Sequence, residues 1–157
     1  MLALLFALLA ADTPPSLSAK LKPPPEAILR PAGPPASKPD SRPTPLQAGI
    51  HVEVGKSMKK GKWTKLPDGR QVWRLALRSP GAKAMRVHFD RFAGVAGTVW
   101  VHDGIQAAGS YTGDGPNSDK SFWSHPVLGE LTVVEFLPTT GKALPFVIDR
   151  ISHQSIE

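Results

Sequence analysis

Alternating apolar and polar residues run through the chain from residue 49 onward. Within residues 71–78, Trp73, Leu75 and Leu77 share one side of an extended segment, and residues 85–90 repeat the pattern. Strict alternation is typical of strands that bury one face. Shorter apolar runs follow at residues 98–102, 121–124, 131–137 and 144–151.

Turn signals separate these runs, and they favour an all-β fold. Pro67-Asp68-Gly69, Ser79-Pro80-Gly81 and Asp103-Gly104 each interrupt the alternation, as expected between short strands. No window carries a sustained helical period. The sequence therefore predicts an antiparallel β-sandwich, jelly-roll-like, over residues 49–157.

The N-terminal third has a different composition. Residues 2–11 form an unbroken run of ten apolar residues, which is too short to span a bilayer but suits a secretory signal core. Eleven of the 17 prolines lie in residues 12–48, and proline supports neither a helix interior nor a sheet ladder. We therefore predict a signal peptide over residues 1–11 and a disordered proline-rich linker over residues 12–48. The protein is expected to be secreted, periplasmic or on the cell surface, with no membrane span.

Cysteine and charge narrow the classes of function. The chain has no cysteine, which excludes disulfide scaffolds, thiolate metal sites and cysteine nucleophiles. Residues 56–91 hold eleven basic and two acidic side chains, and such an imbalance can attract an anionic partner. No recognised nucleic-acid motif accompanies these lysines, so nucleic acid is not an expected partner.

Two groups of residues could bind a metal. His88 and His102 are placed on adjacent predicted strands, but two ligands are too few for zinc. Asp114, Asn117 and Asp119 form an oxygen-rich loop of the kind that calcium accepts, without the bidentate glutamate of a helix–loop–helix site. We predict no metal cofactor, with calcium at this loop as the weaker alternative.

Catalytic motifs are sparse. The Gly-x-Ser-x-Gly elbow of many serine hydrolases does not occur. Five histidines and several aspartates leave a chance triad possible in space, so a cryptic hydrolase remains an alternative. The sequence favours a protein that is not an enzyme.

Aromatic residues are the best candidates for a contact site. Trp100 falls on the same side of its predicted strand as His102, where it could serve as an exposed platform for a sugar ring or a partner. Packing of Trp100 in the core or at an edge of the sheet is the alternative. Trp100, Tyr111 and Trp123 are the predicted contact residues.

Several short blocks, in order, resemble a known bacterial module. They are Gly61–Trp63 with Asp68-Gly69, Val72–Leu75 with Ser79–Ala82, Val87–Phe89 with Phe92, Gly109–Gly113, Phe122-Trp123, Gly129-Glu130, and Pro145–Ile148 with Ser152-His153. Together they resemble the N-terminal β-sandwich of secreted trypsin-like serine proteases of the lysyl-endopeptidase type.

The resemblance implies a non-catalytic, prodomain-like module whose partner is a trypsin-like peptidase domain, engaged by protein contact. In that family the catalytic triad belongs to a separate peptidase domain. A module that binds polysaccharide or another cell-surface polymer is the alternative function, supported by the aromatic residues and the proline-rich linker.

Overall fold

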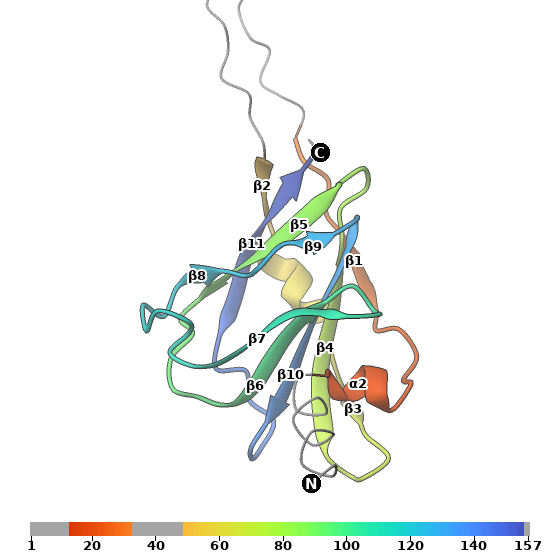
Figure 1. Ribbon diagram of the computed structural model, residues 1–157, viewed down its shortest axis with the longest axis vertical. Helices are drawn as coiled ribbons and strands as arrows, with labels where there is room; N and C mark the ends of the chain where they lie inside the picture. The colour runs from red at the N-terminus through yellow and green to blue at the C-terminus, as the bar shows by residue number, and fades with distance from the viewer. Residues whose placement is uncertain (1–12, 33–48, 156–157) are drawn as a thin grey trace, which may run out of the picture.

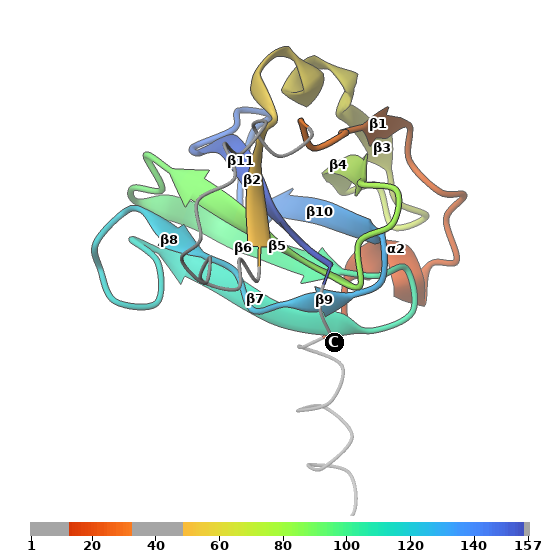
Figure 2. The same ribbon diagram turned by 90° about the horizontal axis from the view of Figure 1, so that it is seen from above.

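Two β-sheets pack face to face in the computed structural model, which describes residues 13–32 and 49–155 (Figures 1 and 2). The predicted signal peptide at residues 1–11 and the later part of the predicted linker, residues 33–48, lie outside the described residues.

The first sheet is built around its long strands. β4 (Gln71–Arg78), β10 (Leu131–Pro138), β6 (Val95–His102) and β7 (Ala107–Gly113) follow one another in that order. Two short strands share the outer edge of β4. β1 (Glu26–Ile28) pairs with it in parallel and β3 (Lys62–Lys65) antiparallel.

The second sheet has the order β2 (Gly49–Glu53), β11 (Val147–Gln154), β5 (Ala84–Asp90) and β8 (Phe122–Trp123). β9 (Val127–Leu128) pairs with the other end of β5. Two short helices complete the described fold: α2 (Pro15–Ser18) and the 3-10 helix η1 (Gly55–Lys60).

This strand order confirms the predicted jelly-roll-like sandwich. When β8 and β9 are taken as one interrupted strand, eight main strands follow in chain order as β2, β4, β5, β6, β7, β8/β9, β10 and β11. Their positions in the two sheets are 1-8-3-6 and 2-7-4-5, which is the arrangement of two interleaved Greek keys. The first and last strands are therefore neighbours.

The core lies between the sheets. Leu75 and Leu77 of β4 are fully buried, and Trp73 is 3% exposed, as their alternation predicted. Phe89 of β5 contacts several aromatic rings, and its centroid lies 5.5 Å from that of Phe146. Apolar side chains from both sheets thus form a single aromatic-rich core, which supplies most of the driving force for folding.

The N-terminal segment, residues 13–32, differs from the extended disordered linker predicted over residues 12–48. It forms α2 and β1 and lies against the outside of the first sheet, where Figure 1 draws it in orange and red. Proline is compatible with the first turn of a helix, where its missing N–H is not needed. Ala27, in β1, is fully buried. Proline content therefore did not prevent ordering, because this segment has an edge strand to pair with.

Candidate functional site

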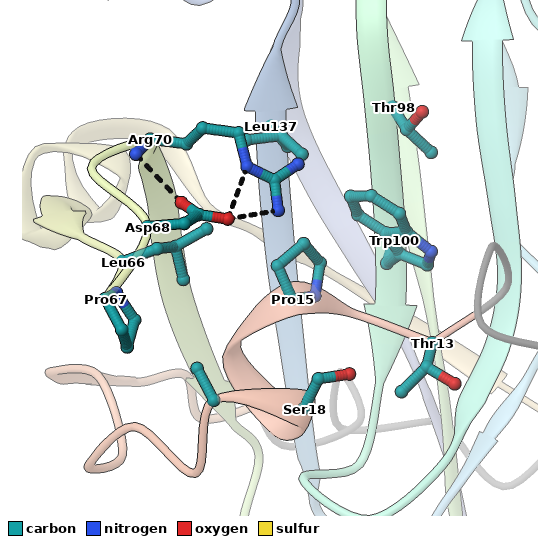
Figure 3. A pocket seen from close by; sticks show the side chains of 11 residues that line it. Thr13, Pro15, Ser18, Leu66, Pro67, Asp68, Arg70, Thr98, Trp100 and Leu137 are labelled. Atoms are coloured by element: carbon teal, nitrogen blue, oxygen red, sulfur yellow. Dashed lines mark hydrogen bonds and ion pairs between the residues drawn. The ribbon is translucent and has the colours of Figure 1, made fainter.

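A pocket opens between the N-terminal segment and the outer face of the first sheet (Figure 3). Its volume is about 490 Å³. Three parts of the chain line it: the α2 region, the turn between β3 and β4, and the strands β6 and β10. The lining residues are Thr13, Pro15, Ser18, Ala19, Leu66, Pro67, Asp68, Arg70, Thr98, Trp100 and Leu137.

The rim of the pocket is polar and its wall is apolar. Arg70 donates from Nε to Asp68 at 2.9 Å, and both side chains are more than half exposed. Figure 3 shows this pair above Pro15, with Trp100 on the other side of the proline ring. Hydrogen bonding to Arg70 lowers the pKa of Asp68, so the pair stays ionised at neutral pH.

Trp100 lines the pocket but is only 4% exposed. The sequence-based expectation of an exposed platform is therefore wrong for Trp100, because its neighbours in the pocket wall include Thr13 and Pro15 of the N-terminal segment. The core-packing alternative is closer to what is observed, although Trp100 packs on the outer face of the sheet. Its indole N–H has no hydrogen-bond acceptor among the described residues.

A buried carboxylate lies beside Trp100. Glu135 of β10 is directly opposite Trp100 in the register and has no exposed surface. The backbone N–H of Ser16 donates to its Oε1 at 2.8 Å, and the Ser16 hydroxyl donates to its Oε2 at 2.5 Å. A charge at such a position needs partners, because burying an unpaired carboxylate is costly.

His102 supplies a further donor to Glu135. Its Nδ1 accepts a hydrogen bond from the N–H of Gly104 at 3.1 Å, so the ring proton lies on Nε2. Nε2 lies 3.2 Å from Oε2 of Glu135 and donates to it. The histidine and the serine thus bind the same carboxylate.

Arg74 of β4 completes the cluster. Its Nη1 donates to the carbonyl of Lys22 at 2.9 Å, a second polar link between the N-terminal segment and the sheet. Burial lowers the pKa of the Arg74 guanidinium, and the charge of Glu135 opposes that shift. The two opposite charges therefore stabilise each other within the covered face.

The arrangement of this cluster suits a structural role and not catalysis. In a serine hydrolase the histidine lies between the serine and the carboxylate, so that it can accept the serine proton. Here Glu135 lies between Ser16 and His102, so the hydroxyl donates to the carboxylate directly and not to the histidine. The cluster holds residues 13–25 against the sheet.

The other two predicted contact residues lie elsewhere. Tyr111 is 6% exposed, and its hydroxyl accepts the backbone N–H of His125 at 2.9 Å. Burial raises the pKa of this phenol. Trp123 is half-buried on the outer face of the second sheet, with its ring 4.9 Å from that of His51. The structure therefore does not bring Trp100, Tyr111 and Trp123 together on one surface.

The candidate metal ligands are also separated. His88 belongs to β5 and His102 to β6, in different sheets, so their predicted placement on adjacent strands is wrong. In the oxygen-rich loop, the Asp114 carboxylate accepts the N–H of Gly94 at 2.7 Å. Among the described residues no three His, Asp or Glu side chains are grouped to hold a metal.

Sequence reasoning missed three residues of the buried cluster, Ser16, Arg74 and Glu135, and singled out His102 only as a candidate metal ligand. Ser16 falls in the segment predicted to be a linker, and nothing local marks it. Glu135 and Arg74 are visible in the sequence, because each is a charged residue within an apolar strand pattern. A charge at such a position is expected to have a buried partner, but the identity of that partner depends on the tertiary structure.

Fold and site together define a class of protein: a jelly-roll module in which the buried cluster around Glu135 is structural. Comparison with protein families then identifies it further. The lysyl endopeptidase N-terminal domain matches residues 20–155, and the chain belongs to that family. The predicted family resemblance is thereby confirmed. No curated protein and no solved structure showed significant similarity.

Proposed function

We propose that this chain is an exported accessory module that binds a trypsin-like peptidase domain of the lysyl-endopeptidase type and acts by contact. The family match over residues 20–155 is the observation that carries this proposal. It spans β1 and every strand of the sandwich, which supports treating the β-rich module as the unit that engages the partner. Among the described residues no helix is long and apolar enough to cross a membrane.

The lysine-rich edge formed by η1 and β3 is the contact surface that we favour. Lys59 and Lys60 end η1, and Lys62 and Lys65 lie at the two ends of β3; all four side chains are exposed. Among the described residues no ion pair engages them. A peptidase selective for lysine needs a pocket that accepts an ammonium group, so exposed lysines are suitable ligands for it.

The backbone of this edge suits recognition as an extended strand. β3 pairs with β4 and with no other described strand, which leaves its second edge available for strand addition. Gly61 is extended, with φ −60° and ψ 143°, and an added Cβ would lie 2.2 Å from the Trp73 ring. The Lys60–Lys62 segment is therefore held close to the core, which lowers the entropy lost on binding.

The test measures binding and inhibition with a purified lysine-specific peptidase domain. The full chain should bind it and change its rate of cleavage of a lysyl ester, or raise its yield on refolding. Replacing Lys59, Lys60 and Lys62 by Gln should weaken binding by about tenfold or more, since losing such contacts costs at least ~1.4 kcal/mol.

A matched control removes cations elsewhere. Lys20, Arg30 and Arg91 are exposed, and replacing all three by Gln should leave binding within about twofold. Binding that is lost equally in the two variants would point to net charge alone. The absence of any effect of the parent chain on activity, binding or refolding would contradict the proposed function.

The environment of Trp123 supports polysaccharide binding as a second candidate function. Its half-buried ring is flanked by His51 and by the Arg150 guanidinium, which lies 5.5 Å from the ring centroid. Sedimentation with insoluble polysaccharides would test it. Retention of the parent chain and loss in Trp123→Ala would favour that function over peptidase contact.

A further inference from the structure

Three side chains on the outer face of the second sheet form a hydrogen-bonded series. Nδ1 of His88 lies 2.7 Å from Oδ1 of Asp149, and Oγ of Ser121 lies 3.4 Å from Nε2 of the same ring. The carboxylate accepts the Nδ1 proton, so Nε2 of the neutral ring is free to accept the serine proton. This is the order of a hydrolase triad, with the histidine in the middle.

Asp149 reaches His88 because of a β-bulge. The register between β11 and β5 shifts between Ile148 and Arg150, which leaves Asp149 without a partner residue across the ladder. A bulge re-aims the side chain of the extra residue. Asp149, which bonds to His88, thereby shares a face with Arg150, whose guanidinium lies over the Trp123 ring. The bulge thus supplies a carboxylate beside the imidazole, and the Nε of Arg150 lies 3.7 Å from Oδ2 of that carboxylate.

Ser121 is exposed but its backbone is held in place. The preceding residue, Lys120, has a left-handed backbone with φ 63°, which is unfavourable for a residue with a Cβ. The N–H of Lys120 donates to the backbone carbonyl of Asp114 at 3.0 Å, and the carbonyl of Lys120 accepts the N–H of Phe92 at 2.9 Å. Such strain persists only where surrounding contacts maintain it.

The accessibility of this serine separates it from the other serine–histidine pair. Ser79 lies 2.7 Å from Nδ1 of His153, but Ser79 is fully buried and His153 is 5% exposed. Ser121 is exposed, while His88 is 7% exposed and packs its ring at 4.8 Å against Trp123. The imidazole is therefore fixed in orientation and the hydroxyl is open to a reagent.

We propose that Ser121, His88 and Asp149 form a nucleophilic site that reacts with small activated esters and phosphonyl electrophiles. Ser121 is the nucleophile, His88 the general base, and Asp149 a positioning residue that orients the imidazole. The site is distinct from the lysine-rich edge, and its reactivity does not depend on peptidase binding.

The step with an ester is an acyl transfer. Ser121 Oγ bonds to the carbonyl carbon while its proton passes to Nε2 of His88. The bond from that carbon to the leaving oxygen breaks, and the leaving group takes the proton from His88. Water then gives a proton to Nε2 of His88 and bonds to the acyl carbon. The bond from that carbon to Ser121 Oγ breaks, Oγ takes the proton back from His88, and the acid leaves. With a fluorophosphonate the same attack expels fluoride, and the phosphonyl group stays on Ser121.

A fluorophosphonate probe and p-nitrophenyl acetate test the site in the full chain. One phosphonyl group per chain should map by mass spectrometry to Ser121, with none on Ser79. Ser121→Ala should abolish labelling and the release of p-nitrophenol. His88→Gln should slow labelling by roughly 100-fold, as expected for loss of a general base, and Asp149→Asn by about tenfold or more.

Three comparisons make the result decisive. Ser110→Ala removes an exposed serine of β7 and should leave labelling unchanged, and heat-denatured chain should not label. Asp149→Asn preserves shape at a partly exposed position, so it decides the question if His88→Gln fails to fold. Absence of label on Ser121, or equal labelling rates in the parent and Asp149→Asn, would overturn the proposal.

Discussion

Glu135 is an acidic side chain in the middle of a strand, and it is completely buried. Its partners come from residues that are distant in sequence: Ser16 is 119 positions away and His102 is 33 positions away. Removing one member of a buried charged cluster leaves the others unpaired, which costs more than the interaction itself contributes. The effect of a substitution here therefore measures how firmly the N-terminal segment is attached.

Glu135→Ala should lower the free energy of unfolding by about 3 kcal/mol, because three hydrogen bonds are lost and Arg74 loses its counter-charge. Urea denaturation followed by tryptophan fluorescence measures the change. Glu53→Ala, at the exposed end of β2, is the control and should stay within about 0.5 kcal/mol of the parent. Similar losses in both variants would show that the cluster adds no more to the free energy of unfolding than an exposed carboxylate does.

β1 shows how one short strand is fixed by backbone pairing and by charge. Its three residues pair in parallel with β4, and the N–H of Leu29 donates to the carbonyl of Arg78 at 2.8 Å. The Arg78 guanidinium donates two hydrogen bonds to Glu26 and a third to Glu130. One arginine thus links β1 to the turn before β10.

The attachment of β1 should weaken in acid. Hydrogen bonding to Arg78 lowers the pKa of Glu26 below its ordinary value. A carboxylate with a lowered pKa stabilises the fold above its unfolded-state pKa, about 4.3, and that contribution is lost as the pH falls through the lowered value. The protection factor of the Leu29 amide, measured by NMR hydrogen exchange, should therefore drop below about pH 4.

Glu26→Gln provides the comparison for this pH dependence. Without the ionisable group, the Leu29 protection factor should start lower and change less between pH 6 and pH 3. A drop of the same size in the variant would assign the pH dependence to other groups, with Glu130 the first to examine, since its pKa is also lowered, chiefly by a hydrogen bond from the Gly81 N–H.

The long strands were predictable because their signal is local. Alternation in residues 71–78 and 85–90 marked β4 and β5, and turn residues marked their ends. β1 has only three residues, too few for a period to be recognised, and it follows three prolines. Its existence depends on the unpaired edge of β4, which no local pattern reveals.

At the scale of the whole molecule, residues 13–32 belong to the folded domain. The sequence placed the start of the folded domain at residue 49, whereas the family match begins at residue 20 and the described contacts at residue 13. Residues 13–32 cover Trp100, pair with Glu135 and extend the first sheet. A domain without them would expose an aromatic ring and would remove both Ser16 donors from the buried Glu135 carboxylate.

A chain of residues 49–157 should therefore be less stable than one of residues 12–157. We expect the melting temperature to fall by roughly 10 °C, as loss of about 3 kcal/mol would cause in a domain of this size. Differential scanning calorimetry measures it, and a red shift of tryptophan emission, absent when Trp100 is replaced by Phe, would report exposure of that ring. Equal melting temperatures would contradict a structural role for residues 13–32.

The sequence by itself determined the long strands at residues 71–78 and 85–90, the sides of them that face the core, and the family, because alternation, turn residues and ordered motifs are properties of neighbouring residues. Only the tertiary structure decided which strands share a sheet, what covers Trp100 and which groups meet Glu135 or His88. Those contacts join residues tens of positions apart, and their formation depends on the closure of two sheets rather than on any local preference.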